Sequence, residues 1–222
     1  DLDYFDQECR AAMETERAVV VNFGGTAIGD VSMVPGLGLV APRGIRDVSE
    51  WYISTITRQD YLHQVFERQT AIAIENLSRV FERVGNTPDA VYVCGTDFGT
   101  QDSQFCSIET YRELYHPYYA RINGWIHEHT SWKTFKHSDG AVEPLLPEFI
   151  ASGFDIINPV QLSAAGMDPK SLKRSYGDKI TFWGGGTDTQ STLPFGTPEE
   201  VYEEVLERLD LLAEGGGYVF NA

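Results

Sequence analysis

Basic residues are scarce in this chain. Its 222 residues include 17 lysines and arginines against 33 aspartates and glutamates, which gives a formal net charge of -16 at pH 7. A surface of this sign repels the phosphates of nucleic acids and the anionic surfaces of membranes. We therefore expect neither a nucleic-acid partner nor a membrane partner.

Long apolar runs are missing as well. No run in the sequence approaches the roughly 20 apolar residues that a membrane-spanning helix needs. The first ten residues, DLDYFDQECR, also lack the basic start and apolar middle of a secretory leader. Together these absences predict a location in the cytoplasm.

Cysteine is also in short supply. The chain has three, Cys9, Cys94 and Cys106, and no two of them form a C-x-x-C pair. Neither a disulfide framework nor a thiolate zinc knuckle follows from this spacing. We expect three reduced thiols, with Cys94 buried in a strand just before a polar motif.

Hydrophobic residues, by contrast, make up 42% of the sequence, which is enough for one sizeable core. They gather in short, nearly continuous apolar runs, a pattern typical of strands buried on both faces of a parallel sheet. Six segments have this character: 18–25, 89–97, 132–140, 154–161, 179–186 and 216–222. Helical patterns lie between them, at 60–84, 107–128, 143–151 and 196–217. This alternation predicts an α/β fold with right-handed crossovers.

Two architectures fit the alternation, an open doubly wound sheet and a closed (β/α)₈ TIM barrel. No G-x-G-x-x-G follows the first strand, which disfavours the dinucleotide-binding version of the open sheet. Six strands in 222 residues are fewer than the eight strands and roughly 250 residues of a complete barrel. We therefore expect one domain, 1–222, that is an incomplete barrel truncated at both ends, with an intact smaller sheet as the alternative.

Polar side chains follow four consecutive predicted strands. In parallel α/β folds the carboxyl ends of the strands meet at one rim, where reactive groups collect. Any single Asp, Asn or Thr at such a place is also what turns and helix caps use. Because four loops converge, we expect a site there, with a set of substrate-binding residues: Gln101, Asn158, Gln161, Asp188 and Gln190.

His137 and Asp139 are the sharpest local feature of this rim. Two residues apart in a strand, they point to the same side, so they could hold one metal ion or share one proton. A metal would need a third ligand, from Asp97, Cys94 or Asp188. The alternatives are proton transfer with Asp139 assisting His137, and a purely structural histidine beside a helix cap.

The order of these motifs resembles the uroporphyrinogen decarboxylase superfamily, which also holds corrinoid-linked methyltransferases. The resemblance rests on GTDFGTQDSQFCSIETYRELYHPYYARI, KHSDGAVEPLLPEFIASGFDIINPVQ, FWGGGTDTQSTLPFGTPEEV and GGGYVFNA, and it covers the chain from about Ala18 onward. It implies a (β/α)₈ barrel with its site at the carboxyl-end mouth. It also places Thr96 near a serine of the decarboxylases, so the catalytic candidates are Thr96, Asp97, His137 and Asp139.

Within that superfamily, the methyltransferase branch resembles this chain but differs from it in the metal-binding motif. It uses zinc bound by an H-x-C motif and a later cysteine, whereas this chain has His137 and Asp139. The resemblance then implies a metal site at His137 and Asp139 with nitrogen and oxygen ligands, suited to zinc or another divalent metal. A corrinoid, carried by a partner protein, would be the methyl carrier. A decarboxylase would need no cofactor.

Charge favours the methyltransferase branch. A tetrapyrrole with many carboxylates would be repelled by the acidic chain and by the rim carboxylates Asp97, Asp139 and Asp188. The expected function is therefore methyl transfer between a small-molecule substrate and a corrinoid protein. Three alternatives remain open: uroporphyrinogen decarboxylase, a noncatalytic barrel fragment that forms a homodimer, and a metal-dependent hydrolase or lyase in which Asp97, His137 and Asp139 activate water.

Overall fold

The computed structural model describes residues 2–222, and this part of the chain contains one sheet of six parallel strands. The strands are β1 (Val20–Val21), β2 (Ala90–Cys94), β3 (Lys133–His137), β4 (Ile156–Asn158), β5 (Thr181–Trp183) and β6 (Tyr218–Val219). Each lies within one of the six predicted segments. Their order in the sheet follows the sequence without a reversal, β1 to β6. A doubly wound sheet reverses its order at a switch point, so this α/β fold is of the barrel type, here with six strands.

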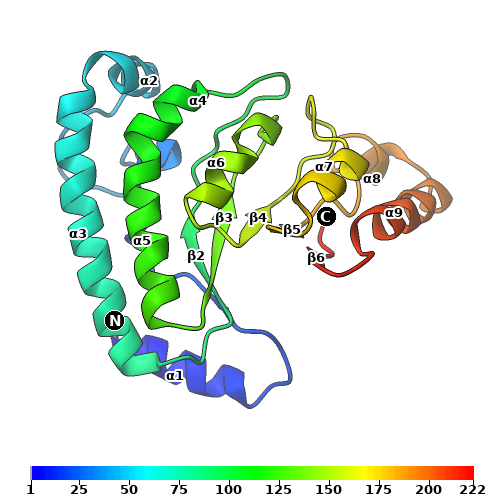
Figure 1. The fold of residues 1–222 in the computed structure, drawn as a ribbon, viewed down its shortest axis with the longest axis horizontal. Helices are drawn as coiled ribbons and strands as arrows, with labels where there is room; N and C mark the ends of the chain where they lie inside the picture. Colours follow the sequence, from blue (N-terminus) through cyan, green and yellow to red (C-terminus); the bar gives the residue numbers. More distant parts are fainter. Residues whose placement is uncertain (1) are drawn as a thin grey trace.

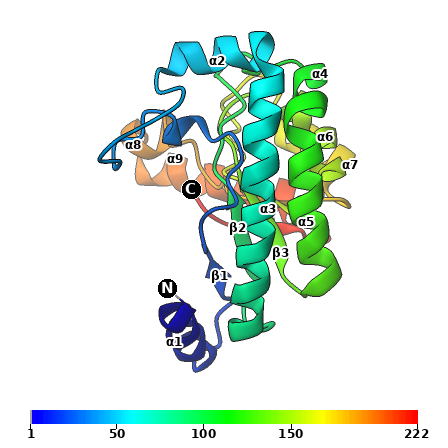
Figure 2. The ribbon, with the colours of Figure 1, turned by 90° about the vertical axis from the view of Figure 1, so that its left-hand side faces the viewer.

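Helices connect the strands and cover the outside of the sheet (Figure 1). They are α1 (Leu2–Met13), α2 (Val48–Thr57), α3 (Gln59–Val84), α4 (Ile108–Thr110), α5 (His116–His129), α6 (Leu146–Ala151), α7 (Pro169–Tyr176), α8 (Thr192–Phe195) and α9 (Pro198–Leu212). Figure 2 shows α3 and α5 side by side, running along the strands. The predicted helices at 60–84 and 196–217 are confirmed as α3 and α9. The pattern at 107–128 divides into α4, a π-helical segment Tyr111–Tyr115, and α5.

Residues alternate between the two faces of β3, and this alternation positions the site. Phe135 packs on the inner face of the curled sheet with Ala90 and Ile156. His137, two residues on, belongs to the same face and ends the strand. Lys136 points the opposite way, into the core between sheet and helices, and is fully buried.

Lys136 is an unusual member of that core. Its ammonium lies 4.6 Å from the ring centre of Phe98 and 4.9 Å from that of Phe149, and donates to the carbonyl of Thr96 at 3.2 Å. It also lies 3.6 Å from the sulfur of Cys94. Burial lowers the pKa of Lys136, although the Cys94 sulfur opposes this shift. Ring faces and a carbonyl thus replace the water that a buried cation loses.

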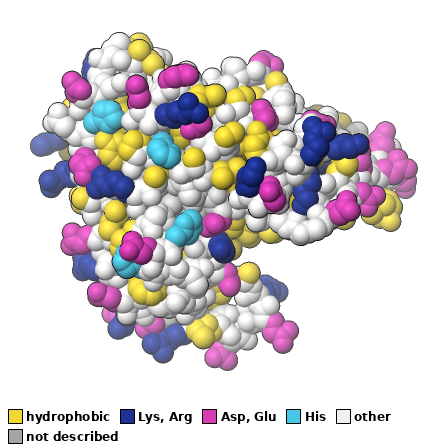
Figure 3. Space-filling view, in the orientation of Figure 1, with side chains coloured by type: hydrophobic (Ala, Val, Ile, Leu, Met, Phe, Trp, Pro, Cys, Tyr) yellow, Lys and Arg dark blue, Asp and Glu magenta, His cyan; other side chains and the backbone are white. Residues whose placement is uncertain are grey.

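The surface carries the acidity expected from the composition. Figure 3 shows acidic side chains gathered over the end of the molecule formed by α9. Elsewhere on this face, acidic and basic side chains are interspersed. Among the helices of residues 2–222, none is both long and apolar enough to cross a bilayer.

Candidate functional site

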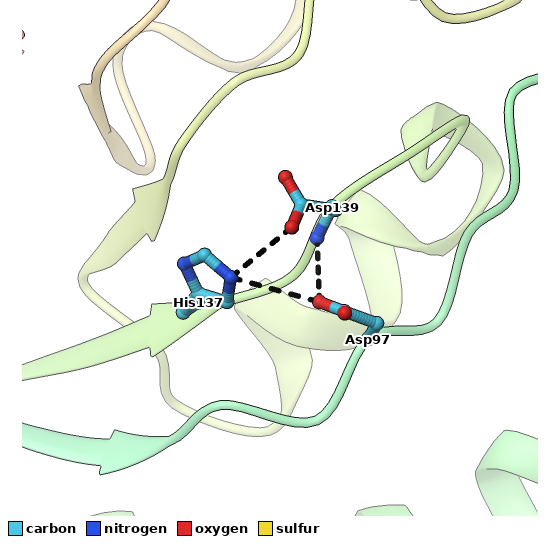
Figure 4. Close-up of side chains that lie close together, drawn as sticks. All are labelled: Asp97, His137 and Asp139. Carbon is cyan, nitrogen blue, oxygen red and sulfur yellow. Dashed lines mark hydrogen bonds and ion pairs between the residues drawn. The ribbon is translucent and has the colours of Figure 1, made fainter. Parts of the chain in front are cut away.

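Three of the predicted catalytic side chains meet at the carboxyl ends of β2 and β3 (Figure 4). The Nε2 atom of His137 lies 3.3 Å from Oδ2 of Asp139 and 3.7 Å from Oδ1 of Asp97. Asp97 also accepts a hydrogen bond from the main-chain N–H of Asp139 at 2.9 Å. One ligand atom from each residue falls within 4.8 Å of the others, which is close enough for the three to bind a single metal ion. We call Asp97, His137 and Asp139 the triad.

Asn158 orients the imidazole of the triad. Its Nδ2 donates to the carbonyl of Trp183 at 3.0 Å, so its Oδ1 is the atom that faces His137. That oxygen lies 2.8 Å from Nδ1 of His137 and must accept a hydrogen bond, so Nδ1 carries a proton. In a neutral ring, Nε2 then presents a lone pair to two carboxylate oxygens. Three acceptors that face one another repel, and a metal cation among them would relieve this repulsion.

A polar cavity of about 440 Å³ opens beside Asp139. Four of the five predicted substrate-binding residues line it: Gln101, Gln161, Asp188 and Gln190. Three of these form a chain of amides, in which Gln161 donates to Gln101 at 2.5 Å and Gln101 donates to Gln190 at 2.6 Å. The main-chain N–H of Gly140 donates to Gln161 and anchors the chain next to the triad. The structure therefore brings these residues together, although their role in binding stays a prediction.

Asp188 also has a local structural role. Its Oδ1 accepts hydrogen bonds from the main-chain N–H groups of Gln190 and Ser191. Burial by itself would raise the pKa of Asp188, but these hydrogen bonds outweigh it and the pKa is lowered. The carboxylate thus closes a turn at the cavity wall.

Two candidate residues contribute neither to the polar cavity nor to the triad, although Cys94 is buried in a strand as expected. Asn158 does not line the polar cavity, because its amide is held by His137 and Trp183. Cys94, considered as a third metal ligand, faces the helix side of β2, where its sulfur contacts Tyr119 and Lys136. The triad instead takes its third side chain from Asp97, one of the alternatives to Cys94.

The sequence pattern missed a second hollow, on the other side of Asp97. We call it the aromatic pocket. Its space is only about 10 Å³, and Thr96 and Asp97 form part of its wall. Five aromatic residues provide most of the remainder: Trp51, Tyr52, Phe98, Phe105 and Tyr115. They come from α2, the β2–α4 loop and the π-helical segment, so no single sequence motif predicts that they meet.

Comparisons with known proteins support the family suggested by the motifs. The family model "Uroporphyrinogen decarboxylase (URO-D)" matches residues 37–222. A solved structure described as a methyltransferase from Methanosarcina mazei superposes with a TM-score of 0.66 at 15% sequence identity. The match covers 99% of this chain and 56% of that protein, so this chain spans little more than half of its length. No curated protein sequence matches the chain significantly.

Proposed function

Because the chain belongs to the uroporphyrinogen decarboxylase family, we propose that it works as a methyltransferase-type member of that family. It would move a methyl group between a small substrate and a corrinoid carried by a partner protein. The observation that carries this proposal is the triad with its oriented imidazole. The structural similarity to a protein described as a methyltransferase is in keeping with it.

The donor set of the triad fits a divalent metal. His137 offers a nitrogen whose opposite ring N–H is already hydrogen-bonded to Asn158, and a metal-binding histidine usually has its other ring N–H bonded in this way. Asp97 and Asp139 add two carboxylates, which would balance a charge of +2. Nitrogen and oxygen donors without sulfur suit zinc or a harder divalent ion. Such a metal would supply Lewis-acid activation of a substrate heteroatom.

The surroundings of the triad argue against a tetrapyrrole substrate. Among the described residues that line the polar cavity, Arg208 is the only basic one, and it donates to Glu204. Asp139 and Asp188 face the same space. A substrate with many carboxylates would meet two negative charges and one positive charge that is already paired. A small methylated compound avoids this repulsion.

Elemental analysis by plasma mass spectrometry tests the proposal. We expect near-stoichiometric zinc, or another divalent metal, in the wild type and its loss in His137→Ala and Asp139→Ala. His129→Ala is the matched control, because His129 is exposed and bonds only to the carbonyl of Trp125 among the described residues. Methyl transfer with methylcobalamin, followed by absorbance, should fall in the same two variants. A metal-free wild type, or full turnover by His137→Ala, would contradict the proposal.

A further inference from the structure

We propose that the polar cavity binds a polyhydroxylated ring, and that the substrate of this site is a methyl ether of a sugar or of a cyclitol. The proposal rests on the proposed function and names the class of substrate on which that function would act. Bound this way, the hydroxyl groups would occupy the polar cavity and the ether oxygen would lie at Asp139. The methyl group would then lie beside the triad.

The triad is open to solvent, so a methyl group held there can be reached by an acceptor. The side chains of His137, Asp97 and Asp139 are 30%, 39% and 47% exposed. In the transfer, the bond between the methyl carbon and the ether oxygen breaks, and its electron pair stays on the oxygen, which takes a proton from water. The two electrons of the new bond to carbon come from the reduced corrinoid of the partner protein. Because the ether oxygen would face the cavity, the opposite side of the carbon would stay free for this approach.

The size of the polar cavity admits such a ring. Its volume of about 440 Å³ falls within the range of roughly 300–1,000 Å³ that is typical of small-molecule sites. At roughly 30 Å³ for each water-sized group, the cavity has room for about 15 such groups. A six-membered ring that carries hydroxyl groups therefore fits, together with some ordered water.

The chain of amides offers the hydrogen-bonding pattern that neighbouring hydroxyl groups need. A side-chain amide has two N–H donors and two acceptor lone pairs. Among the described residues, Gln161 and Gln101 each use one donor and one lone pair in the chain, whereas Gln190 uses one lone pair. Every amide thus keeps at least one donor and one acceptor. A hydroxyl group also donates and accepts, so adjacent hydroxyl groups can bond along this chain.

The charges around the cavity favour a neutral ligand. Asp139 and Asp188 repel an anion, and Arg208, the only basic side chain in the described part of the lining, is already paired with Glu204. A cation would be attracted by the carboxylates. However, the described lining contains no aromatic residue, so the ring faces that bind methylated ammonium groups are missing. A polyol carries no charge and needs no such ring faces.

One wall of the cavity gives the C–H side of a ring an apolar surface of fixed shape. Pro159, Val160 and Leu162 form this wall. Val160 has a φ of 62°, a conformation that is costly for a β-branched residue and persists only where the surroundings enforce it. Gly185 packs against it so closely that an added Cβ would lie 2.8 Å from the carbonyl oxygen of Val160. Backbone strain of this kind clusters at ligand sites, which agrees with a role of this wall in binding.

Saturation-transfer NMR in metal-free buffer tests the proposal with three methyl ethers. The probes are 3-O-methyl-D-glucose for the sugar, D-pinitol for the cyclitol, and methoxycyclohexane, which has the ring and the methyl ether but no hydroxyl group. We expect at least one polyol ether to bind roughly 10-fold or more tightly than methoxycyclohexane, because a site built to bond hydroxyl groups rejects an analogue that lacks them. The polyol ether that binds more tightly identifies the kind of ring. Its methoxy protons should receive less saturation than its ring protons, since the methyl group would lie at the exposed triad.

Two variants remove the hydrogen-bonding groups and keep the length of the side chain. Gln101→Met and Gln190→Met each replace an exposed amide of the chain, so the fold should persist while the affinity for the polyol ether falls roughly 10-fold. Gln69→Met is the matched control, because Gln69 is exposed on α3 and does not line the cavity. Circular dichroism verifies that all three variants are folded.

The outcomes separate this proposal from the broader one. No binding of either polyol ether, equal binding of methoxycyclohexane, unchanged affinity in Gln101→Met and Gln190→Met, or stronger saturation of the methoxy protons than of the ring protons would overturn it. None of these results depends on corrinoid or metal, so methyl transfer from another compound could still be observed. Conversely, selective binding of a polyol ether without turnover would retain the ligand class of the cavity and reject the transfer reaction.

Discussion

The two hollows beside the triad differ in how they are built. The aromatic pocket is enclosed by rings from α2, the β2–α4 loop and the π-helical segment, and it merges with the hydrophobic core. The polar cavity is formed by loops that follow β2 to β5, and amide and carboxylate side chains line it. Asp97 borders the first and Asp139 borders the second. One cluster therefore faces a rigid apolar environment on one side and an adaptable polar one on the other.

The pKa shifts of titratable groups differ between the two hollows in the same sense. On the aromatic side, burial raises the pKa of Tyr52, and the charge of Asp97 adds to this. Burial also raises the pKa of Cys106 to about 11, although Lys136 opposes it. On the polar side, hydrogen bonds to Asp188 prevail over burial and lower its pKa. The aromatic side thus favours neutral groups, whereas the polar side supports a charge.

The largest expected contrast between the two hollows is in stability. Trp51→Ala should lower the free energy of unfolding by about 3 kcal/mol, because a buried ring leaves a cavity. Gln190→Ala, in the exposed wall of the polar cavity, should change it by less than about 0.5 kcal/mol. Urea unfolding followed by circular dichroism measures both. Similar changes in the free energy of unfolding for the two variants would contradict the view that the aromatic pocket belongs to the core and the polar cavity to the loops.

A smaller effect should separate orientation from ligation in the triad. Asn158→Leu removes the acceptor that fixes the His137 ring, and it should weaken metal binding by roughly 10- to 100-fold. Asn158→Asp keeps an acceptor at that place and should retain most of the affinity. Competition with a chromophoric chelator gives both constants. If Asn158→Leu binds metal as tightly as the wild type, the orienting role of Asn158 is wrong.

The smallest effect concerns reactivity on the aromatic side. Because the pKa of Cys106 is raised to about 11, its thiol is protonated at neutral pH, and its alkylation by iodoacetamide should keep accelerating up to about that pH. N-acetylcysteine is the control and should level off earlier, at an ordinary thiol pKa. Peptide mass spectrometry assigns the modified cysteine. A plateau for Cys106 at the pH of the control would show that the pocket is well solvated.

Local patterns in the sequence were enough to predict the strands and much of the rim. Apolar runs located all six strands, and spacing by two placed His137 and Asp139 on one side. The same alternation, applied to β2, would have turned Cys94 away from the rim had the exact end of that strand been known. The aromatic pocket could not be predicted, because Trp51 and Phe105 are far apart in the sequence and meet only through tertiary packing. The role of Asn158 was missed because a strand-end amide looks the same whether it binds substrate or a neighbouring side chain.

The buried position of Lys136 has a consequence for which sequence changes this strand tolerates during evolution. A slip of β3 by one residue that brought His137 to the place of Lys136 would put the imidazole among the rings of Phe98 and Phe149, and would move the ammonium to the apolar inner face beside Ala90 and Ile156. Both of these placements are unfavourable. Lys136 therefore disfavours insertions or deletions that would shift the register of this strand. Single substitutions at the rim can then occur while β3 keeps its register in the sheet. A residue remote from any reacting atom thereby protects the capacity of the site to acquire new specificity.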